Sequence, residues 1–438
     1  MQQPPKLDLF DLYFDYVSGT EPPAVFHRWS LVGCVSALLG RQFWFPFGDG
    51  RIFANQYIMF VGEPGTRKST AIKKACKLLR ASGYDFFGAQ KTSMEKFLLD
   101  LQDGLDGDEV EFDSAGTGRG KKKEAIDILA NLNLKLAGDT DNVIRETFVA
   151  ADEFNNFLGS GNLAFQSLLG ELWDWDEPTA PYKQRLKTSK SVSIYQPTVT
   201  ILAGNTPSSF ADCFPVASIG QGFMSRLILI HSDPSGIKVT IPSAPPEQQR
   251  LAIIEHLRRI KQVVIGAATV EPEAIGALDL IYKGWIDMED TRFRHYSSRR
   301  LTHLIKLTLV CAACRLSSTI TVRDVIYANT ILHYAETTMP KAIGELGTSK
   351  SSQAANKIMQ VLYPARDFVT HRELYKVVRN DLNDLKELSP LLIGLEQSEK
   401  IFSGKNSKGE TGYLARQKPM SRQNAYTNLD LLKGREFK

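Results

Sequence analysis

The chain of 438 residues carries a formal net charge of +4, with 43% hydrophobic and 23% charged residues. This length allows two or three domains with a sizeable core, and the weakly basic balance permits a polyanionic partner without requiring one. The five cysteines are scattered, and neither a secretory signal nor a long uncharged apolar stretch is present. These features argue against disulfides and against a membrane partner, and they predict a cytoplasmic location.

Two helices are predicted at the start of the chain. Residues 8–40 carry apolar side chains at helical spacing, and we assign 1–48 to an N-terminal helical segment. The first core strand is expected over 51–61.

A glycine-containing loop follows this strand and gives the strongest functional signal. The segment 61–70 reads Val-Gly-Glu-Pro-Gly-Thr-Arg-Lys-Ser-Thr, between the apolar run 57–60 and a helix predicted from 71 to about 80. Strand, loop and helix in this order are the context of a phosphate-binding P-loop, in which backbone N–H groups hold an anion. The expected ATP-binding residues are Gly62, Pro64, Gly65, Thr66, Arg67, Lys68, Ser69 and Thr70.

Lys68 and Ser69 have separate expected roles in this loop. Lys68 reaches the β- and γ-phosphates, and the Ser69 hydroxyl binds Mg²⁺. Arg67 departs from the usual pattern, which has glycine before the lysine. The alternative interpretation is a fortuitous loop that binds no nucleotide.

The chain between the P-loop helix and residue 145 divides into ordered and irregular parts. A strand over 84–87 and a helix over 92–101 are predicted. Residues 103–145, rich in acids and glycine with a glycine–lysine loop at 116–123, are expected to be a partly mobile insertion.

A short buried strand, 146–151, ends in a pair of acids and is expected beside the P-loop strand. Asp152 at its tip is predicted to bind the water shell of Mg²⁺. Glu153 is predicted to accept a proton from the attacking water. The alternative is an acid pair that stabilises a helix N-terminus.

Two further strands complete the predicted core, which spans 49–242. The strand 191–202 leads to Asn205, whose amide can orient the attacking water, although Asn-Thr-Pro is also a good turn. Arg226 precedes the last strand, 226–230. Supplied by a neighbouring subunit, its guanidinium would stabilise charge on the transferred phosphoryl group; the alternative is a solvated surface arginine.

Beyond the proline-rich break at 242–246, residues 243–346 are predicted to form a helical lid. Arg299 and Arg300 open the helix that carries an apolar stripe over 301–309. Either arginine could reach the nucleotide, or could pair with acids.

The last folded piece, 347–418, reads as three helices and a hairpin, which is the order of a winged helix. Its third helix is expected to begin at Ser389 and Pro390. The acids Glu396 and Glu399 on this helix argue against base reading in a major groove. Lys405 and Lys408 on the hairpin favour backbone contact, and a protein partner is the alternative. The polar tail 419–438 is expected to be disordered.

The series of P-loop, Asp152-Glu153, Asn205 and Ser225-Arg226-Leu227 resembles the AAA+ ATPases of the helicase kind. It is similar to superfamily III and minichromosome maintenance helicases, and most of all to helicase-like ATPases of phages and mobile elements. Those phage proteins often carry a basic residue before the P-loop lysine. Ser225-Arg226-Leu227 resembles the Ser-Arg-Phe arginine-finger motif. Arg299-Arg300-Leu301 resembles the Arg-x-Leu start of the lid helix, with Arg299 as the sensor arginine that contacts the nucleotide.

The resemblance covers roughly residues 25–345, with a winged helix appended. It implies an α/β fold: a P-loop AAA+ core with a parallel sheet flanked by helices, a helical lid and a C-terminal winged helix. It also implies a hexameric ring that binds ATP between subunits and threads nucleic acid through its pore, in the host cytoplasm if a phage encodes the chain.

Two basic segments are candidates for contact with DNA. One is the loop 117–123, and the other is 182–190, which lies where related ring helicases carry a pore hairpin. In the second segment the predicted phosphate contacts are Lys183, Arg185, Lys187 and Lys190. The alternative for both segments is a solvated, charged loop.

Three functions are compatible with these features. The first is an ATP- and Mg²⁺-dependent hexameric DNA helicase or translocase, acting on single-stranded or forked DNA with other replication proteins in phage or mobile-element replication. The second is an AAA+ helicase loader or nucleoprotein remodeller without unwinding activity of its own. The third is a non-catalytic binding module in which Arg67 has spoiled the loop.

Overall fold

The computed structural model divides the chain into two compact units, which are described separately. The first comprises the chain up to Ile343 together with its end from Arg422, and the second spans Gly344–Ser421. The described residues are 8–103, 145–186, 191–215, 218, 222–288, 290–344, 350–380, 382, 384–416 and 426–432. Most of the predicted insertion, the basic loop 117–123, Lys187 and Lys190 lie outside these residues.

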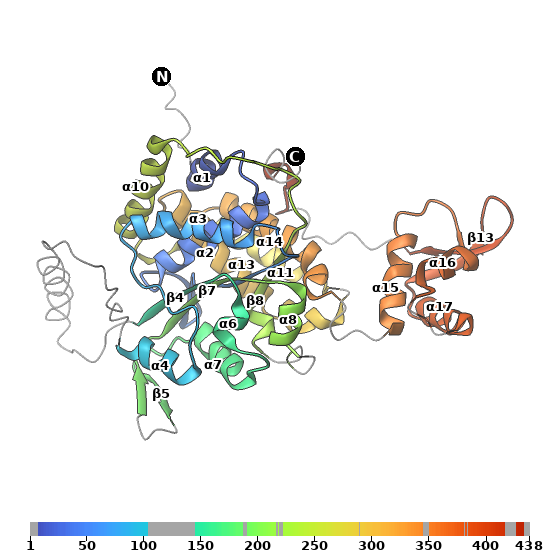
Figure 1. Ribbon diagram of the computed structural model, residues 1–438, viewed down its shortest axis with the longest axis horizontal. Coiled ribbons are helices and arrows are strands. Elements are labelled where there is room, and N and C mark those ends of the chain that lie inside the picture. Colours follow the sequence, from blue (N-terminus) through green and yellow to red (C-terminus); the bar gives the residue numbers. More distant parts are fainter. Residues whose placement is uncertain are drawn as a thin grey trace, which may run out of the picture. The chain divides into compact units, whose positions relative to one another are not determined.

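A four-stranded parallel sheet lies at the centre of the first unit (Figure 1). Its strands, in spatial order, are β4 (Glu146–Ala151), β7 (Thr198–Asn205), β3 (Tyr57–Val61) and β8 (Leu227–His231). These strands are almost wholly apolar and buried, as expected for a parallel sheet covered on both faces. The predicted parallel sheet flanked by helices is confirmed. The prediction that β4 lies beside the P-loop strand is wrong, because β7 pairs with both and separates them.

Helices cover both faces of this sheet (Figure 1). On one side lie α1 (Leu9–Val17), α2 (Ala24–Leu39), α3 (Lys68–Ala81), α13 (Arg300–Cys314) and α14 (Val322–Ile343), and on the other α4 (Met94–Asp103), α6 (Phe154–Leu158), α7 (Leu163–Trp173) and α8 (Pro207–Cys213). Every residue of α2 from Val25 to Leu39 is buried, because α2 is sandwiched between the sheet and other helices. The predicted N-terminal segment 1–48 is therefore an integral part of the core.

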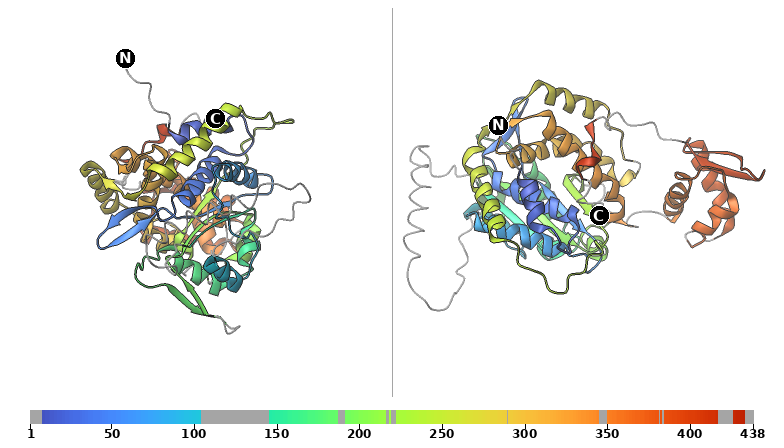
Figure 2. Two further views of the ribbon diagram at one scale, coloured as in Figure 1. Left: turned by 90° about the vertical axis from the view of Figure 1, so that its left-hand side faces the viewer. Right: turned by 90° about the horizontal axis from the view of Figure 1, so that it is seen from above.

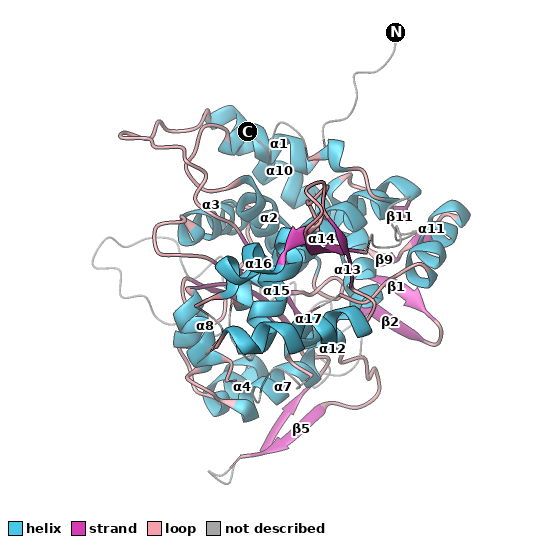
Figure 3. Cartoon of the chain, turned by 90° about the vertical axis from the view of Figure 1, so that its right-hand side faces the viewer, coloured by secondary structure: helices cyan, strands magenta, loops and turns pink. Residues whose placement is uncertain are grey.

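Two predicted strands are each broken in the structure. The expected strand 51–61 divides into β2 (Gly50–Phe53), paired with β1 (Phe43–Phe47), and β3 (Figure 3). The expected strand 191–202 divides into β6 (Ser191–Ile194) and β7. Between them Gln196 adopts a φ of 44°, which is not a strand conformation, and Pro197 follows, which has no N–H to donate to a neighbouring strand. Hydrogen bonding between strands is therefore interrupted here. Over 84–87 a single bridge joins Phe87 to Phe148 in place of a strand.

The predicted lid region is helical and belongs to the first unit. It contains α10 (Glu247–Val263), α11 (Pro272–Lys283) and α12 (Arg294–Ser297), followed by α13 and α14. Three two-residue strands, β9 (Gly266–Ala267), β10 (Thr269–Val270) and β11 (Thr319–Ile320), connect this region; β9 pairs with β1. Helix α14 packs along β8, which fixes this region against the sheet.

The second unit contains three helices and a three-stranded sheet. Its elements are α15 (Lys350–Leu362), β12 (Val369–Thr370), α16 (His371–Val378), α17 (Leu388–Gln397), β13 (Ile401–Lys405) and β14 (Thr411–Ala415). The sheet has the order β12-β14-β13, and β12 was not foreseen. Helix α17 begins at Leu388 and not with Ser389 as its cap, because a 3₁₀ turn over 385–387 leads directly into it.

Part of the predicted disordered tail packs against the first unit. Asn329 Nδ2 on α14 donates hydrogen bonds to Tyr426 O (3.0 Å) and Thr427 Oγ1 (3.1 Å). The Asn428 N–H donates to Thr330 Oγ1 (3.0 Å), and Leu432 is fully buried. The expectation of disorder is therefore wrong for 426–432, because a polar composition does not reveal a partner on a distant helix.

No helix in the described part of the chain combines the length and the apolar character that crossing a bilayer requires.

Candidate functional site

The segment predicted to be a P-loop lies at the carboxyl edge of the sheet, between β3 and α3. Its start is tied to the neighbouring strand by a hydrogen bond from the Gly62 N–H to Asn205 O (3.3 Å). The loop closes on itself, since the Thr66 N–H and Oγ1 both donate to Glu63 O (3.3 and 2.9 Å). Helix α3 begins at Lys68, so the N–H groups of its first turn have no partner within the helix. The arrangement can accept an anion at this point.

The Lys68 ammonium is folded back over the loop. Its Nζ donates to the carbonyl oxygens of Gly62 (2.5 Å) and Glu63 (3.1 Å) and to Thr66 Oγ1 (3.2 Å). Burial lowers the pKa of Lys68, while the carboxylates of Glu63 and Glu153 act in the opposite direction. Lys68 is thus a partly desolvated cation within the field of Glu153.

Arg67 occupies a left-handed backbone conformation, with φ 63° and ψ 26°. This is the region that glycine adopts without steric cost, so the backbone here is the one that a glycine would give. The Arg67 side chain is 53% exposed, and its Nε pairs with Glu21 Oε2 at 2.5 Å. The guanidinium therefore points to the α1–α2 connection and does not fill the cradle of the loop.

Gly204, the penultimate residue of β7, brings the P-loop and the acid pair together. A Cβ at this position would lie 2.7 Å from Asp152 O and 3.7 Å from Lys68 Cβ. The parallel register sets Ala151 beside Ala203 and Val61 beside Asn205, so the ends of β4, β7 and β3 meet at one edge. Any side chain at 204 would separate Asp152 from Lys68.

Asp152 and Glu153 differ in their contacts. The Asp152 carboxylate forms an ion pair with Lys73, one turn and a half along α3 from Lys68. Glu153 is the residue before α6 and has an extended backbone, but its side chain makes no capping bond. The Glu153 carboxylate is therefore not used to cap α6. A ligand that binds the Asp152 carboxylate has to displace the Lys73 ammonium.

Asn205 ends β7 and is fully buried. Its Nδ2 lies 3.8 Å from Met59 Sδ, and within the described part of the chain its Oδ1 has no hydrogen-bond partner. A buried amide oxygen without a hydrogen-bond partner is energetically costly. Such atoms are rare in folded proteins and call for an explanation, of which a functional role is one.

The donor set near Ser69 and Asp152 suits Mg²⁺. Mg²⁺ is bound in proteins by one or two oxygen side chains together with phosphates and waters, and the half-buried Ser69 and Asp152 supply a hydroxyl and a carboxylate. No group of three or more ligating His, Cys, Asp or Glu side chains occurs among the described residues. Ser69 and Asp152 are the residues that could supply oxygen ligands to Mg²⁺ here.

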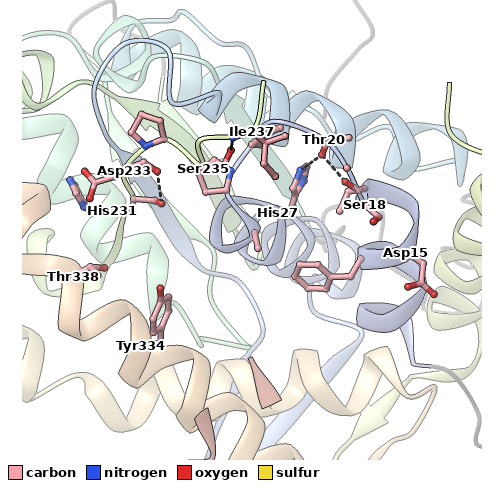
Figure 4. A pocket seen from close by; sticks show the side chains of 18 of the residues that line it. Asp15, Ser18, Thr20, His27, His231, Asp233, Ser235, Ile237, Tyr334 and Thr338 are labelled. Atoms are coloured by element: carbon pink, nitrogen blue, oxygen red, sulfur yellow. Dashed lines mark hydrogen bonds between the residues drawn. The ribbon is translucent and has the colours of Figure 1, made fainter. Parts of the chain in front are cut away.

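A hollow of about 690 Å³ lies next to the P-loop (Figure 4). Ser232, on its wall, lies close enough to Gly62 that a Cβ there would be 3.2 Å from Ser232 O. The lining comes from the α1–α2 connection, from the segment after β8 and from α14, with Phe14, Pro22, Pro23, His27, Asp233 and Tyr334 among its residues. The volume is that of ordinary small-molecule sites.

His27 in this hollow is a neutral hydrogen-bonding group. Its Nε2 lies 2.9 Å from Thr20 Oγ1, and Figure 4 shows this pair on the wall formed by α1 and α2. Burial lowers the pKa of His27 to about 3. The lining therefore offers aromatic and proline surfaces, uncharged polar groups such as His27 and Thr20, and the charged residues Asp15, Asp233 and Lys341.

Arg226 and Arg299 lie at the opposite, amino edge of the sheet. Arg226 directly precedes β8, whose first residue, Leu227, pairs with Tyr57 at the start of β3. Arg226 Nη2 and Arg299 Nη1 both bind Asp174 Oδ2, at 3.2 and 2.7 Å. Neither arginine therefore approaches the P-loop of its own chain.

Arg300 is a structural residue. It is buried, and its Nε and Nη2 donate to the Glu336 carboxylate on α14 (2.8 and 3.1 Å). Of the two arginines that open α13, only Arg299 is available to a ligand.

The β5–β6 hairpin, with β5 over Tyr182–Arg185, protrudes from the first unit (Figure 2). Lys183 and Arg185 are exposed on β5, and their cross-strand neighbours are the exposed Ser193 and Ser191. Neither cation forms an ion pair with any other described residue, so this face of the hairpin is cationic and rich in hydroxyl groups.

Sequence reasoning missed Glu21 and Asp174. Each contacts its arginine across a long stretch of chain, and neither stands in a motif. The only local signal was the turn Gly19-Thr20-Glu21-Pro22-Pro23, which marks a tight connection without revealing its partner.

No family model matches this chain, and no curated protein matches it either.

Proposed function

We propose that this protein is an ATP- and Mg²⁺-dependent P-loop ATPase of the AAA+ kind that acts on DNA as a hexameric helicase or translocase in phage or mobile-element replication. One observation carries the proposal: Lys68, Asp152, Glu153 and Asn205 converge at the carboxyl edge of a parallel sheet, where open α/β sheets bind ligands.

The P-loop would bind the triphosphate. Lys68 exchanges its three loop oxygens for β- and γ-phosphate oxygens, and the N–H groups at the start of α3 complete the anion site. The adjacent hollow takes the nucleoside, with Phe14 and Tyr334 as apolar surfaces and His27 as an uncharged polar group. Ser69 and Asp152 would hold Mg²⁺, which supplies neutralisation of phosphate charge when bound.

Glu153 and Asn205 would serve the attacking water. Glu153 makes no capping bond at α6, so its carboxylate can accept a proton from water. Asn205 lies at the end of the strand between Lys68 and Glu153, and its Oδ1, which has no partner among the residues that the structure describes, can orient the same water.

Arg226 and Arg299 would act on the nucleotide of a neighbouring subunit. Both lie at the edge of the sheet opposite the P-loop, so contact with a phosphoryl group requires a second copy of the chain. Arginines supplied in trans are worth about 10³- to 10⁵-fold in turnover in comparable NTPases.

The β5–β6 hairpin would contact DNA. Lys183 and Arg185 neutralise phosphates without reading sequence, and the serines opposite them can donate hydrogen bonds to phosphate oxygens.

The second unit would serve as a winged helix, a proposal supported by its three helices and three-stranded sheet. In this interpretation its α16 and its wing, and not α17, face nucleic acid. Arg372 and Lys376 lie four residues apart on α16 and Arg379 directly follows this helix, and Lys408 of the wing lies close enough to influence Glu373 on the same helix. These cations favour contact with the phosphate backbone.

The second candidate function is a helicase loader or remodeller, favoured by the surface of α17. Its exposed residues are Ser389, Pro390, Ile393, Gly394 and Gln397, so this face is uncharged and only partly polar. Such a face suits a protein partner better than DNA.

ATP hydrolysis with and without single-stranded DNA, followed by strand displacement on a forked duplex, tests the proposal. Wild type is expected to hydrolyse ATP faster with DNA and to unwind the fork, and Glu153→Gln is expected to bind ATP but to do neither. Hydrolysis without unwinding, together with stoichiometric capture of a replicative helicase, would favour the loader. Absence of hydrolysis by wild type would rule out both.

A further inference from the structure

The Asp174 carboxylate joins two arginines that come from different parts of the first unit. Asp174 follows the last residue of α7, Arg226 ends the turn before β8, and Arg299 precedes α13. Both guanidinium groups bind the same oxygen, Oδ2. The single carboxylate therefore sets the spacing of the two cations.

Cationic side chains surround this carboxylate. Besides the two arginines, the buried Lys306 lies nearby; burial lowers its pKa to about 7, and Asp174 acts in the opposite direction. Lys306 Nζ lies 4.4 Å from the centre of the Trp173 ring, and the Arg226 guanidinium lies 5.8 Å from the same centre. The two guanidinium groups share one carboxylate oxygen, so an anion with several oxygens can compete for their donors.

Open space adjoins the cluster on the side of Arg226. A hollow of about 640 Å³ is lined by Arg226 together with Gly222 and Phe223 before β8, and by Leu163, Ala164, Ser167, Gly170 and the acidic Glu171 of α7. Gly222 is needed here, because a Cβ would lie 2.9 Å from Arg226 Nη1. The Arg226 Nε is buried and, within the described part of the chain, has no hydrogen-bond partner. The guanidinium thus has an unused donor.

We propose that Asp174 is a stand-in for a phosphoryl group: it holds Arg226 and Arg299 together in the free protomer and gives them up to the terminal phosphate of a nucleotide bound to a second copy of the chain. This inference rests on the proposed function and identifies Asp174 as a positioning residue. A carboxylate and a phosphoryl group compete for the same guanidinium donors, so nucleotide binding between subunits is opposed by the Asp174 contacts. Arg299 directly precedes α13 and Asp174 directly follows α7. Replacement of the Asp174 contacts by phosphate contacts therefore changes the contacts at the ends of both helices when nucleotide binds.

The kinetic test separates this role from a structural one. In Asp174→Asn the competitor loses its charge, and the KM for ATP is expected to fall about two- to fivefold, the effect of a partly exposed ion pair, while kcat stays within about twofold of wild type. Asp174→Glu keeps the charge and should behave like wild type. A purely structural pair predicts the opposite: a lower kcat with an unchanged or higher KM.

Asp176→Asn is the matched control. Asp176 stands two residues away, but it pairs with Arg51 (Nη2 to Oδ1, 2.6 Å) and Arg41, whereas Asp174 pairs with Arg226 and Arg299. Loss of the Asp176 carboxylate should lower thermal stability without lowering the KM for ATP. A fall in KM in this variant equal to that of Asp174→Asn would overturn the proposal.

A second measurement does not depend on hydrolysis. In a Lys68→Ala background, which disables the P-loop, inorganic phosphate is titrated during thermal unfolding. Adding Asp174→Asn should increase the rise in Tm with phosphate, and adding Arg226→Gln as well should abolish that increase. Equal stabilisation with and without Asp174 would overturn the inference even if wild type hydrolyses ATP. If wild type lacks ATPase activity, this titration still decides whether the arginines bind phosphate in competition with Asp174.

Discussion

Arg226 and Lys68 lie at opposite ends of two adjacent parallel strands. Lys68 follows the carboxyl end of β3, Arg226 precedes the amino end of β8, and the paired strands run from Tyr57 and Leu227 to Val61 and His231. Four residue steps along a strand span about 13 Å, and each side chain lies beyond an end of this stretch. One nucleotide therefore cannot contact both residues of the same chain.

Mixing two inactive variants is expected to restore ATPase activity. Lys68→Ala and Arg226→Ala should each reduce turnover at least about 100-fold, because one removes phosphate binding and the other removes the arginine supplied in trans. In a mixture, some interfaces combine an intact Lys68 from one copy with an intact Arg226 from the next. Steady-state ATP hydrolysis of an equimolar mixture measures this recovery. Activity no greater than the mean of the two variants would show that Arg226 does not act between copies.

Arg67→Gly is expected to retain nucleotide binding and stability. Arg67 already holds φ at 63°, where an ordinary side chain costs about 1–2 kcal/mol. Glycine removes that cost, which offsets its greater freedom in the unfolded chain and the loss of a weak pair with Glu21. Arg67→Val, which is β-branched, should instead destabilise the protein. Urea unfolding and binding of a fluorescent ATP analogue check both variants, and Glu21→Gln isolates the ion pair. A large loss of ATP binding in Arg67→Gly would show that the guanidinium itself contacts the nucleotide.

Gly204→Ala is expected to weaken both the fold and ATP hydrolysis. The new methyl group would meet Asp152 O at 2.7 Å, and relief requires a shift of β4 relative to β7 or α3. Overpacking of this kind costs about 1–3 kcal/mol, and the shift moves Asp152 away from Lys68. Gly276→Ala on α11 is the control, since a Cβ there meets nothing within 4 Å and alanine favours a helix. Denaturant unfolding and ATPase rates should separate the two variants.

Features confined to one stretch of chain were predictable, and contacts between distant stretches were not. The helix after the glycine-containing loop was predicted, although it begins at Lys68 and not at 71, and the apolar run before Asp152 forms β4 as expected. The order of the strands was not predictable, because local patterns carry no pairing information. The contacts of Asp174 with Arg226 and Arg299 join residues 52 and 125 positions apart. The hydrophobic periodicity of a sequence carries no information on contacts between residues so far apart along the chain.

The buried Lys306 is expected to make stability depend on pH. Burial lowers its pKa to about 7 from the ordinary 10.5, so between these values the unfolded chain holds one proton more at this residue than the folded chain. Stability attributable to Lys306 therefore rises with pH across this window, by at most about 1.4 kcal/mol per pH unit. Denaturant unfolding of wild type and Lys306→Met at pH 6.5, 8 and 9.5 measures this, since other groups cancel in the difference. Wild type should become more stable relative to the variant as pH rises. A difference independent of pH would mean that Lys306 stays charged.

Removal of Lys183 and Arg185 is expected to weaken binding of single-stranded DNA and to reduce its dependence on salt. Both cations are exposed on β5, unpaired within the described part of the chain, and opposite serines in place of acids. Each phosphate contact releases counterions, so losing two should lower the slope of log K against log salt by about 1.4. Fluorescence anisotropy with a labelled oligonucleotide at several salt concentrations measures the slope for the double alanine variant. Lys283→Ala removes an exposed lysine that pairs with Asp279 on α11, and it should leave the slope unchanged. Equal effects of both variants would indicate that only net charge matters, whereas a weaker affinity with an unchanged slope would show that the hairpin supports the DNA site without touching phosphate.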